Sequence, residues 1–162
     1  MKNYQTSEIK NVVLLGAPGS GKTTFAEAMA FEGKVIDRRG SIENENTLSD
    51  NTDLEHSNRR SIYSTILYTE FMNHKLNIID APGSDDFSGG LFAAFKVADV
   101  GLMLFNAQNG FEVGSEIQSR YAKTYNVPLV GVINQLDSEK ANWEGTLESI
   151  ASFSKVKPIV VQ

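Results

Sequence analysis

The stretch Gly16-Ala17-Pro18-Gly19-Ser20-Gly21-Lys22-Thr23 decides the fold of this chain. It fits the pattern G-x-x-x-x-G-K-[S/T] at every fixed position, and it lies between an apolar run, 11–15, and a helix-like segment, 24–32. Glycines at such a junction let backbone N–H groups turn inward around phosphate oxygens, and the positive end of the following helix adds a partial charge there. The pattern predicts a phosphate-binding loop in which Lys22 reaches the β and γ phosphates and the Thr23 hydroxyl holds Mg²⁺.

The composition is that of one globular domain. A chain of 162 residues with 41% apolar and 22% charged residues is long enough for a single core. The net charge of −5 argues against a surface built to bind DNA directly, because phosphate backbones require a basic stripe. No cysteine is present, and no apolar run is long enough to cross a bilayer. We therefore expect a cytoplasmic protein without membrane contact.

Strand-like and helix-like segments alternate along the chain. Strand character marks 12–15, 61–71, 75–79, 99–105, 127–133 and 158–161. Helical spacing marks 23–31, 87–97, 112–125 and 139–153. The long polar segment 33–60 is typical of a functional loop. The alternation predicts an α/β, three-layer fold of the P-loop NTPase kind, with a mostly parallel sheet and helices on both faces.

A second motif, Asp80-Ala81-Pro82-Gly83, directly follows one of the predicted strands. An aspartate at this place can hold a water molecule on Mg²⁺, and the Gly83 N–H can meet a γ phosphate. Ligands of parallel α/β sheets bind at the carboxyl ends of the strands. We therefore expect Asp80 and Gly83 to lie beside the phosphate loop.

A third motif, Asn134-Gln135-Leu136-Asp137, follows another buried strand and resembles the N-K-x-D base-recognition motif of GTPases. The Asp137 carboxylate can accept hydrogen bonds from both N1–H and the N2 amino group of guanine. Adenine presents an acceptor at N1, so the same site rejects it. The motif favours GTP or GDP over ATP. An ATP-dependent small-molecule kinase, the alternative, is supported by the phosphate loop alone.

With these motifs, the whole chain resembles the front part of the GTPase domain of elongation factor G, the ribosomal translocase. The likeness extends to the stretches 36–40, 46–50, 97–99 and 110–116. It implies a GTP-driven switch that acts on the ribosome, with switch I at 33–64 and switch II at 80–88. The family continues into a last base-contacting loop that is missing here, so we expect residues 1–162 to be a GTP-binding domain truncated before that motif.

The motifs and the resemblance together give a set of expected site residues. The expected contacts of GTP or GDP are Gly16, Ala17, Pro18, Gly19, Ser20, Gly21, Lys22, Thr23, Thr24, Asp80, Gly83, Asn134, Gln135 and Asp137. Thr23 and Asp80 are the expected Mg²⁺ residues. Lys22 and Ser84 are the expected catalytic positions.

The chain departs from the family in the parts that sense and cleave the γ phosphate. The family's R-G-I-[T/S] segment matches Arg60-Ser61-Ile62-Tyr63, which puts Tyr63 where a hydroxyl binds Mg²⁺. A phenol is too long for a tight octahedral ion, and a one-residue slip would offer Ser64 instead. Ser84 stands at the position of the family's catalytic histidine and cannot carry its charge. Gln135 replaces the lysine of the base motif.

Two hypotheses about hydrolysis follow. By family resemblance the chain is a GTPase that the ribosome stimulates. The departures at Tyr63 and Ser84 favour a second hypothesis, a GTP-binding switch with impaired or absent hydrolysis. Losing a group that positions the attacking water typically costs about 10²–10⁴ in rate.

Overall fold

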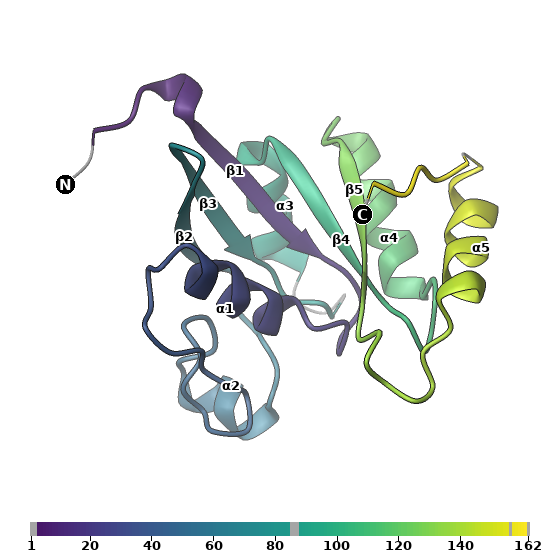
Figure 1. Ribbon diagram of the computed structural model, residues 1–162, viewed down its shortest axis with the longest axis horizontal. Helices are drawn as coiled ribbons and strands as arrows, with labels where there is room; N and C mark the ends of the chain where they lie inside the picture. Colours follow the sequence, from purple (N-terminus) through teal and green to yellow (C-terminus); the bar gives the residue numbers. More distant parts are fainter. Residues whose placement is uncertain (1–2, 85–87, 156, 162) are drawn as a thin grey trace.

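The computed structural model describes residues 3–84, 88–155 and 157–161. Its centre is a five-stranded sheet in the order β2-β3-β1-β4-β5 (Figure 1). The strands are β1 Ile9–Leu15, β2 Thr65–Phe71, β3 His74–Asp80, β4 Val100–Asn106 and β5 Leu129–Asn134. β1 pairs in parallel with β3 and β4, β4 pairs in parallel with β5, and β2 runs antiparallel to β3. The prediction of a mostly parallel sheet is confirmed.

Helices cover both faces of this sheet (Figure 1). They are α1 Lys22–Glu32, α2 Asp53–Asn58, α3 Ser88–Val97, α4 Val113–Thr124 and α5 Trp143–Ser154, and a short 3₁₀ helix, η1 Thr6–Glu8, precedes β1. Successive side chains of a strand point to opposite faces. Val12 and Leu14 of β1 accordingly pack with α1, whereas Val13 and Leu15 pack with α3 and α4. The result is the three-layer architecture that the sequence predicts.

Two predicted strands differ in the structure. β2 begins at Thr65 rather than at residue 61, because the backbone N–H groups of Ile62 and Tyr63 donate to the Glu55 carboxylate instead of to a neighbouring strand. The predicted strand at 158–161 is wrong: the described residues 157–161 form no strand, and Ile159 and Val161 are 86% and 88% exposed. A β-branched run has strand propensity, but a strand also needs a paired neighbour.

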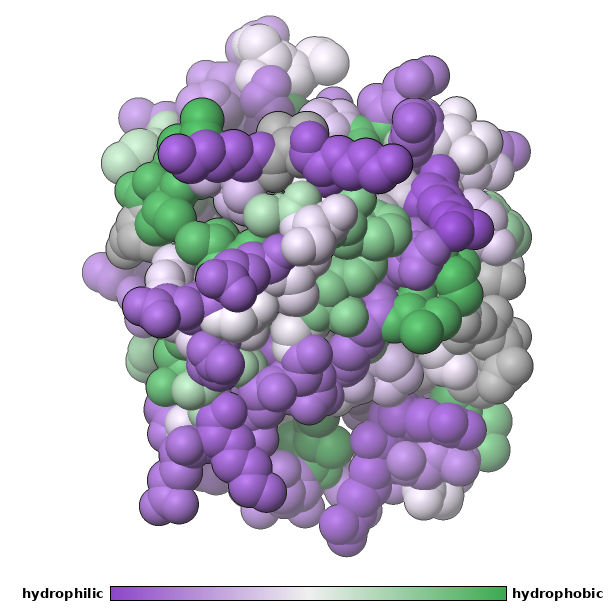
Figure 2. Space-filling model, turned by 90° about the vertical axis from the view of Figure 1, so that its right-hand side faces the viewer, coloured by the Kyte–Doolittle hydropathy of each residue, from purple (hydrophilic) through white to green (hydrophobic). Residues whose placement is uncertain are grey.

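The helix boundaries are set by local hydrogen bonds. α5 begins at Trp143 rather than at residue 139, because the Asn142 side chain accepts a hydrogen bond from the Gly145 N–H and caps the helix there. Ile150 of α5 packs against the same core as α3 and α4. Seen from the side that carries α5, the surface shows hydrophobic groups separated by hydrophilic ones (Figure 2). None of the helices in the described ranges combines the length and apolarity needed to cross a membrane.

The long segment that follows α1 is held by two buried carboxylates. Glu27 of α1 accepts hydrogen bonds from the backbone N–H groups of Gly40 and Leu48. Glu55 forms a capping box with Thr52 at the start of α2, a helix that the sequence analysis did not predict. Because these bonds reach from α1 to the start of β2, the polar segment has a defined path beside the carboxyl ends of the strands.

Candidate functional site

The phosphate loop follows β1 and needs glycine for its shape. Gly16 has a φ of 135°, and a side chain there would clash with the carbonyl oxygen of Leu104 on β4. Gly83, which follows β3, approaches the loop so closely that a Cβ would lie 3.0 Å from Gly16 O and 2.9 Å from Pro18 N. The structure therefore brings the first and second sequence motifs into contact.

Lys22 lies buried at the start of α1, with 7% of its surface exposed. Its Nζ donates to the carbonyl oxygens of Gly16, at 2.9 Å, and Ala17, at 3.0 Å. Burial lowers the pKa of Lys22 to about 8, although the charges of Asp80 and Asp50 oppose this shift. A cation that satisfies only loop carbonyls is well placed to exchange them for phosphate oxygens.

Thr23 and Asp80 form a buried pair beside Lys22. The Thr23 hydroxyl donates to Asp80 Oδ2 at 2.8 Å, and Ser61 Oγ lies 3.2 Å from the same hydroxyl. Asp80 is 1% exposed, and its Oδ1 has no hydrogen-bond partner within the described residues. Burial raises the pKa of Asp80, whereas the nearby hydroxyls of Thr23 and Ser49 and the charge of Lys22 lower it. Hydroxyl and carboxylate oxygens in this arrangement fit a hydrated Mg²⁺ ion.

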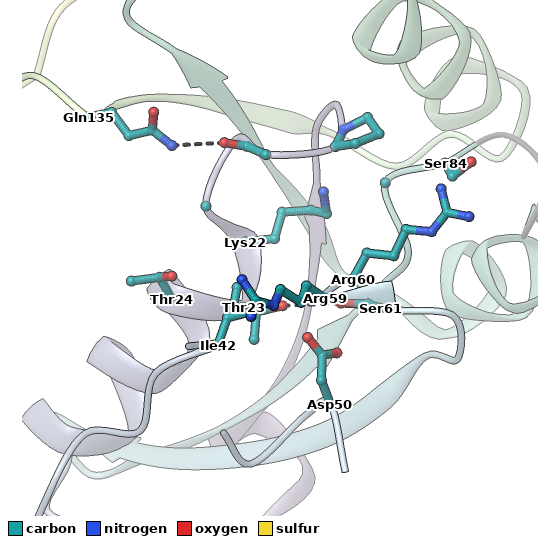
Figure 3. A pocket seen from close by; sticks show the side chains of 14 residues that line it. Lys22, Thr23, Thr24, Ile42, Asp50, Arg59, Arg60, Ser61, Ser84 and Gln135 are labelled. Atoms are coloured by element: carbon teal, nitrogen blue, oxygen red, sulfur yellow. Dashed lines mark hydrogen bonds between the residues drawn. The ribbon is translucent and has the colours of Figure 1, made fainter. Parts of the chain in front are cut away.

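The base motif is tied to the phosphate loop from the end of β5. Asn134 Nδ2 donates to Ser20 O at 2.9 Å, and Gln135 Nε2 donates to Gly19 O at 2.8 Å (Figure 3). Asp137, two residues further on, is exposed. All three motifs thus lie at the same edge of the sheet, as the sequence predicts.

Part of this set lines one pocket of about 230 Å³. The predicted site residues outside its lining are Gly16, Ala17, Ser20, Asp80, Asn134 and Asp137. Figure 3 shows the pocket between the phosphate loop and the segment that ends at β2. Its lining residues are Pro18, Gly19, Gly21, Lys22, Thr23, Thr24, Ile42, Asp50, Arg59, Arg60, Ser61, Gly83, Ser84 and Gln135. Ser84 therefore lines the pocket beside the phosphate loop. Of the predicted switch II, 85–87 lie outside the described residues.

The two hydroxyls proposed for the end of switch I lie away from Thr23. Tyr63 is 58% exposed and is not part of the pocket lining. Ser64 packs against Gly90 of α3, where an added Cβ would meet Ser64 Oγ at 2.5 Å. Ser61, which no sequence motif singles out, is the hydroxyl beside Thr23.

Gln118 of α4 is a second residue that sequence reasoning missed. It is 2% exposed, its Oε1 accepts from the Gly16 N–H at 2.7 Å, and its Nε2 donates to Gly16 O at 3.4 Å. The available signal was its spacing, because Ser115, Gln118 and Ala122 form the buried stripe of α4. A glutamine on such a stripe indicates a buried polar partner.

Comparison with known proteins identifies the family of this chain. The model of the family "Elongation factor Tu GTP binding domain" matches residues 7–159. Elongation factor G of Dehalococcoides mccartyi (strain CBDB1) is 32% identical over 161 residues, which cover 99% of this chain and 23% of that protein. An elongation factor G-like protein of Mycobacterium tuberculosis (strain H37Rv) is 32% identical over 153 residues, which cover 93% of this chain and 21% of that protein.

A solved structure shows the same fold. A crystal structure of a protein from Thermus thermophilus superposes with a TM-score of 0.86 at 32% identity and covers 90% of this chain and 22% of that one. This chain thus spans less than a quarter of the length of these relatives. By sequence and fold, the chain belongs to the elongation factor Tu GTP-binding domain family, as the GTP-binding domain of an elongation factor G-like translational GTPase.

Proposed function

We propose that this chain holds the phosphates of GTP or GDP in the loop 16–23, with Mg²⁺ at Thr23 and Asp80, and serves as the nucleotide switch of a factor that couples nucleotide state to ribosomal translocation. The main support is one observation: Thr23 donates to a buried Asp80 whose second oxygen is unpartnered within the described residues, next to Lys22. The names of the relatives, elongation factor G among them, support the ribosomal role.

Each residue has a distinct task in this proposal. Lys22 leaves the carbonyls of Gly16 and Ala17 and pairs with phosphate oxygens, which relieves its buried charge. Asp80 Oδ1 accepts from a metal-bound water. When bound at Thr23 and Asp80, Mg²⁺ would neutralise part of the phosphate charge. Asn134 and Gln135 fix the position of the base motif by donating to carbonyl oxygens of the phosphate loop. The Asp137 carboxylate accepts hydrogen bonds from N1–H and the N2 amino group of guanine.

Base specificity is tested by displacement of a fluorescent GDP derivative. We expect GTP and GDP to compete at least about 10²-fold better than ATP, since adenine cannot donate to Asp137. In the Asp137→Asn variant the preference should move to xanthosine diphosphate, because xanthine has a carbonyl where guanine has the N2 amino group. Equal competition by ATP and GTP in the unmodified chain would instead support the small-molecule kinase.

We further propose that hydrolysis is slow, because Ser84 lines the pocket where the family has a histidine. A serine hydroxyl orients a water molecule but cannot carry the charge of an imidazole. In single-turnover assays with and without ribosomes, Ser84→His should raise the rate of GTP cleavage by at least about 10-fold, within the range expected for one acid–base group. Ser84→Ala is the matched control and should leave the rate low. Rapid cleavage by the unmodified chain that Ser84→His does not increase would show that hydrolysis is intact.

A further inference from the structure

Gln118 connects α4 to the first residue of the phosphate loop. Its side chain is 2% exposed, and its contact with Gly16 joins residues that are 102 positions apart. Gln118 Oε1 accepts from the Gly16 N–H at 2.7 Å, and Gln118 Nε2 donates to Gly16 O at 3.4 Å. Because a primary amide carries an acceptor and a donor side by side, this one side chain engages both backbone groups of a single residue.

Gly16 has a backbone that its own side chain does nothing to restrict. Its φ of 135° lies in a region that glycine adopts readily and that other residues rarely adopt. The same freedom means that glycine loses more conformational entropy than any other residue when its backbone is fixed. Hydrogen bonds from outside the loop fix Gly16 before a ligand arrives, so less ordering is required when the ligand binds.

The buried carbonyl oxygen of Gly16 accepts a hydrogen bond from a second side chain as well. Lys22 Nζ donates to it at 2.9 Å, a shorter distance than the 3.4 Å from Gln118 Nε2. In the proposed function Lys22 leaves this carbonyl for phosphate oxygens, and a buried acceptor that loses its partner costs free energy. The Gln118 amide already lies within reach of the same oxygen, so it can keep the carbonyl hydrogen-bonded after Lys22 has moved.

We propose that Gln118 is a positioning residue of the nucleotide site. It fixes the Gly16 peptide in the shape that the phosphate loop requires, and it holds the Gly16 carbonyl oxygen when Lys22 turns to the phosphates. This inference rests on the proposed nucleotide function. It extends the site to the buried face of α4, through a residue that acts on the ligand only by way of the loop.

The first test measures nucleotide affinity. Gln118→Met keeps the length of the side chain and removes both its acceptor and its donor. The Kd of a fluorescent GDP derivative in the presence of Mg²⁺ should rise by about 10-fold or more, because the Gly16 carbonyl loses its remaining side-chain partner in the bound form. Ala122→Gly is the matched control, since it lies on the same buried stripe of α4 and weakens the helix. It should lower stability and leave the Kd unchanged.

The second test needs no nucleotide. Lys22→Met and Gln118→Met each leave the Gly16 carbonyl with one of its two side-chain partners, and the double variant leaves it with neither. In urea unfolding the double variant should therefore lose more stability than the sum of the two single losses. Additive losses would contradict a shared acceptor.

A third measurement uses the unmodified chain, so it does not depend on a variant that folds. Nuclear magnetic resonance follows the Nε2 protons of Gln118 while GDP and Mg²⁺ are added. If Gln118 takes over the Gly16 carbonyl, its hydrogen bond shortens, and one Nε2 proton should move downfield and exchange more slowly with solvent. An unchanged chemical shift in the GDP complex would contradict this step.

The outcomes separate this inference from the proposed function. Equal affinity of the unmodified chain and Gln118→Met for GDP would overturn the inference alone, because nucleotide binding would stand. Failure of the unmodified chain to bind GDP would overturn the proposed function, and this inference with it.

Discussion

Lys22 has an electrostatic environment that phosphate oxygens would improve. Its ammonium is buried, and its pKa falls from an ordinary value of 10.5 to about 8 because burial penalises the charged form. Its two partners are neutral carbonyls, which compensate a full charge incompletely. A bound nucleotide would therefore stabilise the charged form of Lys22.

This environment predicts how stability depends on pH. Between about pH 8 and 10.5 the unfolded chain binds a proton at Lys22 that the folded chain has released, so stability must rise with pH across that window. We expect the nucleotide-free chain to gain up to about 3 kcal/mol in the free energy of unfolding relative to its value below pH 8. Urea unfolding of the unmodified chain and of Lys22→Met gives the measurement, since the variant isolates this lysine from other groups that titrate there. Identical pH profiles for the two would contradict the prediction.

Some residues of the site could be predicted from sequence motifs and others could not. A motif with fixed spacing lies on one short backbone segment, so the loop 16–23 and the ends of β3 and β5 were predicted together with their roles. Gln118 reaches the same site from α4, and Ser61 reaches it from the segment before β2. Nothing local in the sequence connects them to Gly16 or Thr23, because those contacts span 102 and 38 residues and exist only once the sheet has formed.

Among the elements, the segment between α1 and β2 depends most on single side chains. Glu27 is 1% exposed and accepts hydrogen bonds from two N–H groups of that segment, those of Gly40 and Leu48. α2 is short and lacks an apolar period, which explains why helical spacing did not predict it. The signal was present in another form, because Thr52-Asp53-Leu54-Glu55 fits the capping-box pattern.

Removing the Glu27 carboxylate should release this segment. In Glu27→Ala the N–H groups of Gly40 and Leu48 lose a charged acceptor, at a cost of about 1.5–3 kcal/mol for a hydrogen bond to a charged group. We expect faster tryptic cleavage at the exposed residues Arg38 and Arg39 and faster amide exchange over 33–64. Glu32→Ala, at an exposed position of the same helix, should behave like the unmodified chain. Equal cleavage rates in both variants would show that Glu27 does not hold the segment.

In the whole molecule, the site joins segments that lie far apart in the sequence. The pocket takes its lining from the loop after β1 and the start of α1, the segment before β2, the loop after β3 and the turn after β5. Helical and strand periodicity predicted that the segments after the parallel strands meet at one edge of the sheet, because parallel strands bring their carboxyl ends to one edge. Periodicity does not predict which strands pair, so it predicted a strand at 158–161 where the structure has none.

A ligand that bridges these segments should stabilise the whole chain rather than one loop. At a free GDP concentration of 100 times its dissociation constant, with Mg²⁺ present, linkage adds about 2.7 kcal/mol, which for a domain of this size corresponds to a rise of about 5–10 °C in Tm. ATP at the same concentration should give a much smaller rise, and chelation of Mg²⁺ should reduce the effect of GDP. Lys22→Met removes the buried cation without changing the fold-forming core, so it should melt cooperatively and show little response to GDP. If GDP raises the Tm of Lys22→Met as much as that of the unmodified chain, the ligand binds somewhere other than the phosphate loop.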